Sequence, residues 1–375
     1  NFLDKRIKIV SSRGDKEMRL EKVLKEMQKR QLTHLIINDP SSIDYLINYK
    51  NNPGERMYLL LLSSDGHHKL FMNNLFYLDH ELDIEQVWYS DTDNYLQLLA
   101  DEFDGACSIG IDKNFPARFL IPLMNLVDEC HFELGSECVD RVRMIKDEKE
   151  QQLMIEASKI NDLVVDEVIN ICAKGDLTEE EVSKQLEGIY QKHGCVGNSF
   201  EPIVAYGKNG ADNHHSGDDS RLKVGDSIVI DIGGLYKGYC SDMTRTVFYK
   251  EVSPKQKTVY ELVLKAQKAA EAMIKPGVRL CDIDKCARDI IAEGGYTVEF
   301  NHRLGHFIGR DVHEWCDVSQ NFDLEVQEGM TFSIEPGVYL QGEFGVRIED
   351  LVLVTKDGCK VLNSYPKDLR VIGND

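Results

Sequence analysis

The sequence predicts an α/β protein of two domains: a smaller N-terminal α/β domain with a mixed sheet over residues 1–143, and a larger C-terminal domain over residues 144–375. Two observations support this prediction. Segments typical of strands and of helices alternate along the first 140 residues, as they do in α/β sheets. Beyond Lys146, a pattern of two helices followed by a β-hairpin occurs twice, at an offset of about one hundred residues. The length of 375 residues is sufficient for two hydrophobic cores.

The composition of the chain limits the kinds of molecule that we expect it to bind. The chain is 42% hydrophobic and 29% charged, which is ordinary for a soluble globular protein. Its net charge of −20 argues against nucleic acid or an anionic membrane surface as a partner. No apolar run is long enough to span a bilayer, and the charged first twenty residues lack the apolar core of a signal peptide. We therefore expect a cytoplasmic protein, with a trimmed start left open because the chain begins at Asn rather than Met.

The ten cysteines do not form a dense pattern. There is no CxxC spacing, which argues against a zinc ribbon or a thioredoxin-type redox site. Dispersed positions such as Cys107, Cys172 and Cys286 are expected to be small buried apolar residues in a reducing compartment.

The first domain begins with an amphipathic helix over 15–30, in which Met18, Val23, Leu24 and Met27 form an apolar stripe. A short buried strand is expected at 33–38, followed by a helix over 39–49 with Pro40 near its N-terminus, where proline is tolerated. The remaining expected elements are strands at 57–63, 69–72, 86–89 and 108–112 and helices at 94–102 and 117–127. No cluster of catalytic residue types lies in this domain, so its expected role is to shape or cover a site.

The second domain begins with one long helix over 147–174, ended by Gly175. Its expected apolar face consists of Leu153, Ala157, Ile160, Val164, Val168 and Ile171. Thr178 and Glu181 have the spacing of a capping box and start a second helix, which runs to about residue 193. In the second half, Ser253 and Gln256 start a helix that reaches 274, and another helix follows over 282–293.

The first predicted hairpin covers 225–246, where strands at 227–232 and 243–248 flank a glycine-rich turn. Asp231 lies near the end of the first strand and Asp242 just before the second. With a turn centred between Tyr236 and Lys237, the two carboxylates are directly opposed on one face, with Cβ atoms ~5 Å apart. Like charges at that distance destabilise a sheet, so a positive group is expected between them. For an isolated pair, the simpler interpretation is a turn residue and a solvated edge residue.

The second predicted hairpin changes that interpretation. In it, Glu335 occupies the position of Asp231, and Glu349, across a turn centred on Gly342, occupies that of Asp242. Two similar halves facing one another would bring four carboxylates to one pseudo-twofold axis. Such a cluster requires cations.

A histidine completes the expected metal site. The expected ligand set consists of the four carboxylates and His306. The carboxylates carry four negative charges, which two divalent ions neutralise. A mostly oxygen ligand set with one imidazole suits Mn²⁺, Co²⁺, Fe²⁺ or Zn²⁺. Ions in such sites lie ~3.5–4 Å apart and share a bridging water or hydroxide.

Histidines are concentrated in one segment. The chain has eleven histidines, and three of them, His302, His306 and His313, fall within twelve residues. Their glycine-rich surroundings favour a functional role over isolated surface histidines. His313 and the following glutamate are not the start of a zinc-binding HExxH motif, because Asp317 stands at its last position. His214 and His215 form another pair, for which a solvent-exposed turn and a functional role both remain open.

Five motifs give the sequence a family resemblance. They occur in a fixed order over more than one hundred residues and contain the five expected ligands: VIDIGG (Asp231), YCSDMTRT (Asp242), HRLGHFIG (His306), SIEPGVY (Glu335) and GVRIEDLVLV (Glu349). The sequence thereby resembles the pita-bread-fold metallopeptidases of the Xaa-Pro dipeptidase (prolidase) and aminopeptidase P group. The resemblance is strong over 145–375 and implies a pita-bread (creatinase/aminopeptidase-like) domain with an internal pseudo-twofold repeat. The first 140 residues resemble the creatinase-type N-terminal domain, most clearly at SSIDYLINY.

The resemblance implies a set of roles at the metals. The five residues would ligate two divalent ions, Mn²⁺ first among the candidates, with Asp242 and Glu349 bridging them. Glu335 would also be the general base. His313 would stabilise the tetrahedral oxyanion.

Around the metals, the resemblance implies that His214, His302 and His313 line the substrate pocket, His214 with a catalytic role. Arg347 would orient the substrate or a bridging carboxylate. The family usually has proline before the position of His214, where this chain has Asn213, so the choice between His214 and His215 stays open. A homodimer is also implied.

The function implied is that of a dinuclear-metal exopeptidase, which hydrolyses the bond between an N-terminal residue and proline, in dipeptides or in longer peptides. A metal-free creatinase-like amidinohydrolase is the first alternative, and the five retained ligands argue against it. A methionine aminopeptidase shares the metal site but lacks the large N-terminal domain. A non-catalytic pita-bread binding module is a third alternative, opposed by the retained ligands and histidines. The physiological metal and the preferred peptide length remain open.

Overall fold

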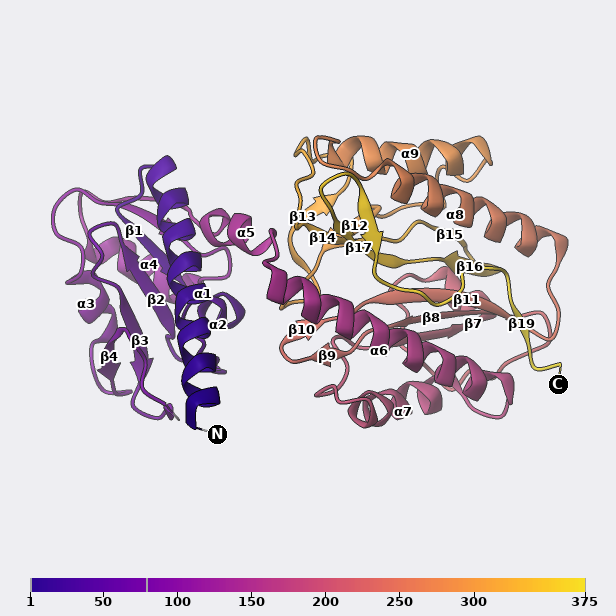
Figure 1. Cartoon of the computed structure of the whole chain (residues 1–375), viewed down its shortest axis with the longest axis horizontal. Helices are drawn as coiled ribbons and strands as arrows, with labels where there is room; N and C mark the ends of the chain where they lie inside the picture. The colour runs from indigo at the N-terminus through magenta and orange to yellow at the C-terminus, as the bar shows by residue number, and fades with distance from the viewer. Residues whose placement is uncertain (1, 79, 375) are drawn as a thin grey trace. The chain divides into compact units, whose positions relative to one another are not determined.

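The computed structural model of the chain describes residues 2–78 and 80–374, with side-chain detail from residue 17 onward. It divides into two compact units, Asn1–Arg143 and Met144–Asp375 (Figure 1). Each unit has its own hydrophobic cores, and each is described by itself.

The N-terminal unit is built on a six-stranded mixed sheet in the order β4-β3-β2-β1-β5-β6. Strands β1, β2 and β3 pair antiparallel, whereas β1 with β5, β5 with β6 and β3 with β4 pair parallel, so the predicted mixed sheet is confirmed. The strands are β1 His34–Ile37, β2 Leu59–Ser63, β3 Lys69–Asn73, β4 Glu85–Tyr89, β5 Ser108–Ile111 and β6 His131–Leu134. The helices are α1 Phe2–Lys29, α2 Pro40–Ile47, α3 Tyr95–Ala100, α4 Ala117–Leu126 and α5 Glu137–Arg143.

Two hydrophobic cores cover the two faces of this sheet. One packs α1, α2 and α5 against it, and the other packs α3 and α4. Val23 and Met27 of α1 are buried as predicted, but Met18 is 53% exposed, so the apolar stripe begins later than the sequence suggested. The helix itself begins earlier, at Phe2 rather than near residue 15.

The C-terminal unit contains two helix pairs. The first pair is α6 Glu148–Ala173 and α7 Glu179–Lys192, and the second is α8 Pro254–Met273 and α9 Leu280–Glu293. The capping boxes predicted from Thr178 and Ser253 are both present, at the starts of α7 and α8. Asp147 forms a further capping box at the start of α6.

Two sheets repeat the same antiparallel order of strands. In the first half, β7 Ile203–Tyr206 pairs with β8 Ser227–Ile232, which pairs with β11 Met243–Tyr249. In the second half, β12 Gly305–Phe307 pairs with β14 Thr331–Ile334, which pairs with β17 Asp350–Val354. The remaining strands are β9 Leu235–Tyr236, β10 Tyr239–Cys240, β13 Glu314–Val318, β15 Gly337–Leu340, β16 Phe344–Arg347, β18 Cys359–Val361 and β19 Val371–Ile372. Each half therefore contains a helix pair followed by three antiparallel strands, in the same order along the chain.

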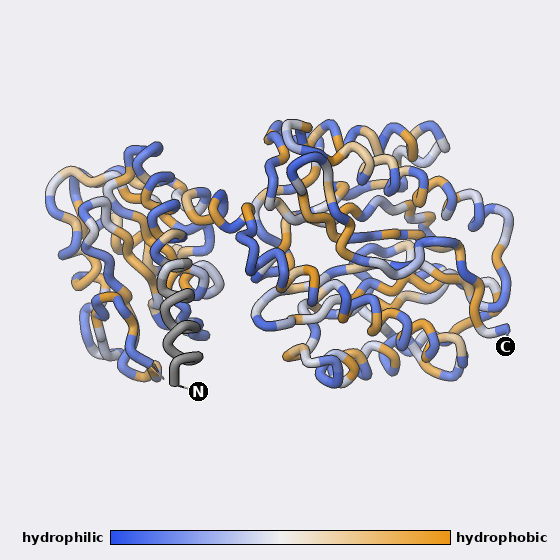
Figure 2. The backbone as a smooth tube through the Cα atoms, viewed as in Figure 1, coloured by the Kyte–Doolittle hydropathy of each residue, from blue (hydrophilic) through white to orange (hydrophobic). Residues whose placement is uncertain are grey.

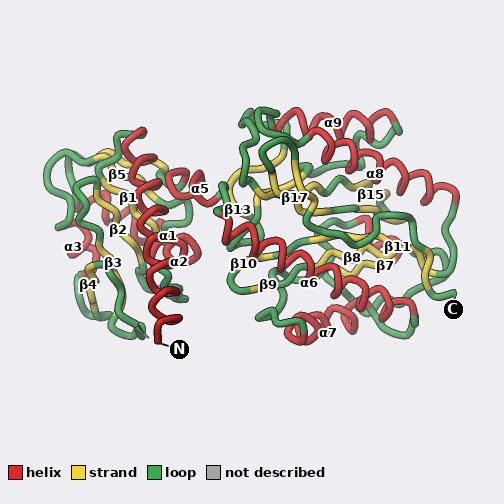
Figure 3. Tube along the Cα trace, in the orientation of Figure 1, coloured by secondary structure: helices red, strands yellow, loops and turns green. Residues whose placement is uncertain are grey.

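The helices lie on the outside of these strands. Figures 1 and 3 show α8 and α9 on one side and α6 and α7 on the other, with the strands between them. One core joins α8 and α9 to the sheet of β12, β14 and β17, and another joins α6 and α7 to that of β7, β8 and β11. Hydrophobic and hydrophilic residues alternate along α8 and α9, as expected of helices with one buried face (Figure 2).

The first hairpin differs from its predicted register. Asp231 lies opposite Thr244 rather than opposite Asp242. The reason is the turn, in which Lys237 and Gly238 both have positive φ, 48° and 84°. Such a two-residue turn suits tightly paired strands, and it is centred one residue later than predicted. The opposed position therefore moves by two residues, and Asp242 stays on the same face as Thr244 because side chains alternate along a strand.

The second hairpin has the predicted register. Ile334 lies opposite Asp350, and Gly337 lies opposite Arg347, which centres the turn on Gly342. Gly342 has a φ of 78°, a conformation that glycine adopts without strain. Glu335, directly after β14, and Glu349, directly before β17, therefore lie at opposed positions of the hairpin.

Among the described residues, no helix combines the length and the hydropathy needed to cross a bilayer. All ten cysteines carry free thiols. Cys107 and Cys172 are buried as predicted, whereas Cys286 is only partly buried.

Candidate metal centre

One cavity of the C-terminal unit collects the residues that the sequence singled out. Its volume is about 610 Å³. Its wall contains all nine predicted site residues: His214, Asp231, Asp242, His302, His306, His313, Glu335, Arg347 and Glu349. It also contains Phe200, Glu201, Ile203, Asn213, Arg303, Val312 and Tyr339.

Both halves of the repeat contribute to the cavity. Asp231 lies near the end of β8, and Asp242 directly precedes β11. His306 is on β12, Glu335 directly follows β14, and Glu349 directly precedes β17. The ends of corresponding strands in the two sheets thus bring the four carboxylates into one cavity, although Asp231 and Asp242 are not directly opposed as Glu335 and Glu349 are.

His306 faces the carboxylates through its Nε2 atom. That atom lies 3.5 Å from Asp242 Oδ2 and 3.5 Å from Glu335 Oε1. The Nδ1 atom lies 3.2 Å from the Phe307 carbonyl, which can only accept, so Nδ1 carries the proton. The Nε2 lone pair is therefore directed to the carboxylates, as in a metal-ligating imidazole.

Three carboxylate oxygens of the cluster are buried without a partner. They are Asp231 Oδ1, Asp242 Oδ1 and Glu349 Oε1, none of which accepts a hydrogen bond from the residues described. The other oxygens of Asp231 and Glu349 are satisfied, at 2.6 Å by Arg347 Nη2 and at 2.7 Å by Thr244 Oγ1. Buried polar atoms are nearly always partnered. These unpartnered oxygens lie in the cavity that also holds His306, and Asp242, His306 and Glu349 offer ligand atoms within 4.8 Å of one another, an arrangement that fits divalent cations.

The ionisation of the cluster leads to the same conclusion. Burial, and then the charge of Asp231, raises the pKa of Asp242 well above its ordinary value. Burial, and then Asp242, raises the pKa of Glu349 in the same way, and burial raises that of Glu335 to about 7. Burial lowers the pKa of His306, which keeps the imidazole neutral. The protein alone thus disfavours the charged cluster, so cations are needed to hold these carboxylates ionised.

Arg347 binds one carboxylate of the cluster through a hydrogen bond. Its buried guanidinium donates to Asp231 Oδ2 at 2.6 Å, to Tyr339 OH at 2.8 Å and to Thr244 Oγ1 at 3.0 Å. The sequence identified Arg347 but not Thr244 or Tyr339. Thr244 could have been suspected only from the correct register, because it is the residue opposite Asp231.

His302 is held in one tautomer. Its Nδ1 donates to the Arg303 carbonyl at 2.6 Å, so its Nε2 accepts from Tyr339 OH at 3.0 Å. Burial, and then the charge of Arg347, lowers the pKa of His302 to about 3. This ring is therefore neutral and fixed.

His313 contacts the His306 ring edge-on, with the ring centroids 4.4 Å apart. Partial desolvation of this exposed ring, and then His306, lowers the pKa of His313 to about 4. A neutral imidazole at this position can donate one hydrogen bond into the cavity.

The adjacent residues His214 and His215 have different neighbours. His214 lines the cavity. His215 instead places its Nε2 2.6 Å from Oε2 of the buried Glu179. Only the first of the pair is a candidate for contact with a substrate.

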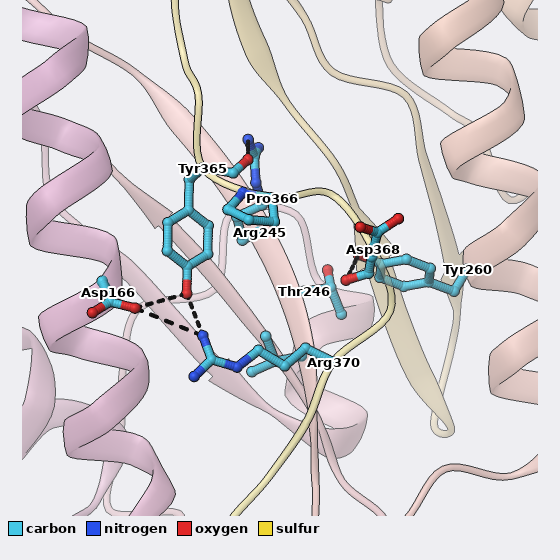
Figure 4. Close-up of a pocket in the computed structure, with 9 residues that line it drawn as sticks. Asp166, Arg245, Thr246, Tyr260, Tyr365, Pro366, Asp368 and Arg370 are labelled. Atoms are coloured by element: carbon cyan, nitrogen blue, oxygen red, sulfur yellow. Dashed lines mark hydrogen bonds and ion pairs between the residues drawn. The ribbon is translucent and has the colours of Figure 1, made fainter.

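A second cavity, of about 400 Å³, lies elsewhere in the C-terminal unit (Figure 4). Asp166 on α6 accepts a hydrogen bond from Tyr365 OH at 3.1 Å, and Arg370 donates to the same hydroxyl. The guanidinium of Arg245 is bound to Asp350 Oδ1 at 2.7 Å. Both arginines of this wall are paired with carboxylates, and the wall contains no histidine, so the first cavity is the candidate site.

Comparison with known families agrees with this site. Residues 152–356 match metallopeptidase family M24, and residues 19–145 match the creatinase/prolidase N-terminal domain. The chain belongs to metallopeptidase family M24. The family recognised in the sequence is thereby confirmed, and M24 membership implies divalent metal ions.

Several relatives match over nearly the whole chain. An Xaa-Pro dipeptidase of Pyrococcus horikoshii is 34% identical over 94% of this chain and 98% of the relative. The crystal structure of a prolidase from Thermococcus sibiricus superposes with a TM-score of 0.90 at 32% identity, covering 96% of this chain and 99% of the other. An X-Pro aminopeptidase from Thermotoga maritima superposes with a TM-score of 0.77 at 30% identity, covering 91% and 98%. The pita-bread fold predicted for the C-terminal part is confirmed.

Proposed function

We propose that this M24 metallopeptidase is a dinuclear exopeptidase, which hydrolyses the bond between an N-terminal residue and proline. The observation that carries the proposal is the set of three unpartnered, buried carboxylate oxygens in the cavity that also holds His306. The relatives described as an Xaa-Pro dipeptidase, a prolidase and an X-Pro aminopeptidase support the substrate class.

Five residues would hold the two divalent ions: Asp231, Asp242, His306, Glu335 and Glu349. Two such ions supply a Lewis acid for the scissile carbonyl and lower the pKa of water. We take Mn²⁺ as the first candidate, since oxygen-rich ligand sets with one imidazole accept it.

The chain's own groups would move protons and stabilise charge. Glu335 accepts the proton of the attacking water and returns it to the departing proline nitrogen. Ser333 Oγ donates to Glu335 Oε1 at 3.1 Å, which orients that carboxylate. The neutral His313 donates to the oxyanion of the tetrahedral intermediate.

The cavity wall suits a substrate with proline in second place. Phe200, Ile203 and Val312 present apolar surface to a pyrrolidine ring. His214 and His302 add polar groups that can orient the peptide, and Arg347 orients Asp231. In this proposal residues 144–375 are the catalytic domain, residues 1–143 are the creatinase-like domain, and the protein is a cytoplasmic homodimer.

The test combines metal content with peptide hydrolysis. Purified protein loaded with Mn²⁺ should contain two ions per chain and cleave an Xaa-Pro dipeptide or an Xaa-Pro-Xaa peptide much faster than an Xaa-Ala dipeptide. Equal cleavage of Xaa-Ala would overturn the specificity. Activity that survives exhaustive chelation would favour a creatinase-like reaction, and a protein with neither metal nor activity would favour a binding module.

A further inference from the structure

The segment between β7 and β8 carries two residues of the cavity wall on irregular backbone. It begins with a short 3₁₀ helix, Gly207–Ala211, and has no further helix or strand before β8 starts at Ser227. Asn213 and His214 in its middle line the cavity. Long irregular loops are mobile unless specific contacts hold them. The position of His214 therefore depends on what fixes this loop.

The buried carboxylate of Glu179 is the centre of such contacts. Glu179 is fully buried at the first position of α7, where a helix N-terminus favours an anion. Its Oε1 accepts from the Tyr206 backbone N–H at 2.6 Å and from Asn209 Nδ2 at 3.0 Å. Its Oε2 accepts from His215 Nε2 at 2.6 Å and from the Asp218 backbone N–H at 3.1 Å. The four donors lie before, within and after the part of the loop that carries His214.

The backbone around Glu179 continues this attachment. The backbone N–H groups of Glu179 and Glu180 donate to the carbonyls of Ser220 and Asp218, at 3.3 and 3.1 Å. Thr178 forms a β-bridge with Arg221. The start of α7 thus holds the returning part of the loop as well as its beginning.

His215 is the side chain that links this centre to the residue beside the cavity. A carboxylate only accepts, so His215 Nε2 carries the proton donated to Glu179. With the His215 ring turned to Glu179, the preceding residue is the one directed to the cavity. This arrangement explains why two histidines follow one another in the sequence.

A metal ion is not the better explanation of Glu179, His215 and Asp218, although their ligand atoms lie within 4.8 Å of one another. Glu179 already accepts four hydrogen bonds, two on each oxygen. Asp218 Oδ1 accepts from the Ser220 backbone N–H at 2.7 Å. These groups form a hydrogen-bonded anchor.

We propose that Glu179 and His215 are positioning residues, which anchor the loop so that His214 faces the substrate. Neither touches the substrate. This inference rests on the proposed function only in that His214 acts on the peptide.

The test is a double-mutant cycle on kcat/KM for an Xaa-Pro dipeptide. His215→Ala should lower kcat/KM roughly 10- to 100-fold, the cost of a misplaced site group. In a His214→Ala background the same change should have little further effect, because the residue being positioned is gone. Glu179→Gln should behave like His215→Ala, and both variants should keep the metal content of the unmodified protein.

A matched pair provides the control. His193 Nε2 lies 2.7 Å from Glu167 Oε1 and joins the other end of α7 to α6. His193→Ala and Glu167→Gln remove the same kind of contact and should leave kcat/KM unchanged.

Amide hydrogen exchange over residues 207–220 measures how firmly the loop is held, independently of activity. It should become faster in His215→Ala and Glu179→Gln and stay unchanged in the control variants. Equal losses of kcat/KM with and without His214, or unchanged exchange in both anchor variants, would overturn the inference. An unmodified protein with no peptidase activity would instead contradict the proposed function, and the exchange rates would still decide whether Glu179 holds the loop.

Discussion

Arg347 Nη2 donates a 2.6 Å hydrogen bond to Asp231 Oδ2, across the two halves of the C-terminal unit. A reciprocal contact runs the other way, in which Thr244 Oγ1 of the first half donates to Glu349 Oε2 of the second at 2.7 Å. The backbone N–H of Glu349 also donates to the Thr244 carbonyl at 3.1 Å. Each half therefore fixes a carboxylate of the other, which couples the geometry of the site to the packing of the repeat.

Replacing Arg347 tests this coupling. Arg347→Met leaves Asp231 and Tyr339 without their buried donor, and we expect metal affinity to fall roughly 10- to 100-fold, as for other groups that orient ligands. Equilibrium dialysis of Mn²⁺ measures the change. Arg279→Met is the control, because it removes an exposed arginine bound to Asp282 and should leave affinity unchanged. Unaltered Mn²⁺ affinity in Arg347→Met would show that Asp231 does not need this donor.

Glu335→Gln separates proton transfer from metal binding. The amide keeps an oxygen that can ligate, but it cannot accept the proton of water, so we expect kcat to fall by ~10²–10⁴-fold. Metal content should stay close to that of the unmodified protein. Glu343→Gln, on the turn of the same hairpin and exposed, should have full activity. Full activity in Glu335→Gln would exclude this residue as the base.

Chelation should destabilise the protein in a pH-dependent way. The folded chain raises the pKa of Glu335 from 4.5 to about 7 and raises those of Asp242 and Glu349 as well. A raised folded-state pKa contributes stability below the unfolded value, and that contribution is lost as pH rises through the folded value. The metal-free protein should therefore lose stability as the pH rises from about 4.5 through 7, the range that Glu335 sets.

The metal-loaded protein should show the opposite trend over that range, because cations bind the ionised carboxylates of the native state only. We expect the difference in Tm between loaded and chelated protein to widen from pH 5 to pH 8. Thermal scans at both pH values measure it. A constant difference would mean that the carboxylates are ionised without the ions.

Much of the site was predictable because its signals are local. Asp231 and Glu335 lie at matching places in strand segments that end in glycine, and His306 lies in a cluster of histidines. The second register followed from Gly342, whose lack of a side chain marks a turn. The capping boxes at Thr178 and Ser253 likewise depend on pairs of residues three apart.

The first register was not predictable in the same way, because it depends on a positive φ at Lys237, a residue that rarely adopts one. The partnership of Thr244 and Tyr339 with Arg347 joins segments that only the folded repeat brings together. Strand β6 was missed because it has only four residues, too few for their alternation of polar and apolar side chains to be distinctive, and its Leu134 is exposed. The anchoring role of Glu179 could not be predicted for a similar reason, since three of its four donors lie in a loop without periodicity.

The peptide length preferred by this enzyme should depend on Arg303. Arg303 and Arg347 are the two arginines of the cavity wall, and the guanidinium of Arg347 is committed to three partners. Arg303 Nη1 donates to Asp317 Oδ1 at 2.7 Å, and its side chain is 34% exposed, which leaves other N–H groups for a ligand. A dipeptide carries a free carboxylate next to the scissile bond, whereas a longer peptide carries a neutral amide there. Arg303 can therefore recognise the dipeptide through a charge-assisted hydrogen bond.

We expect Arg303→Gln to raise KM for an Xaa-Pro dipeptide roughly tenfold or more, the size of a lost hydrogen bond to a charged group. KM for an Xaa-Pro-Xaa peptide should change little. Asp317→Asn is the matched control, because it breaks the same ion pair but leaves the guanidinium at the cavity, and it should not raise KM for the dipeptide. Steady-state kinetics on the two peptides decide the matter. An equal rise of KM for both peptides would show that Arg303 shapes the cavity but does not bind the carboxylate of the dipeptide.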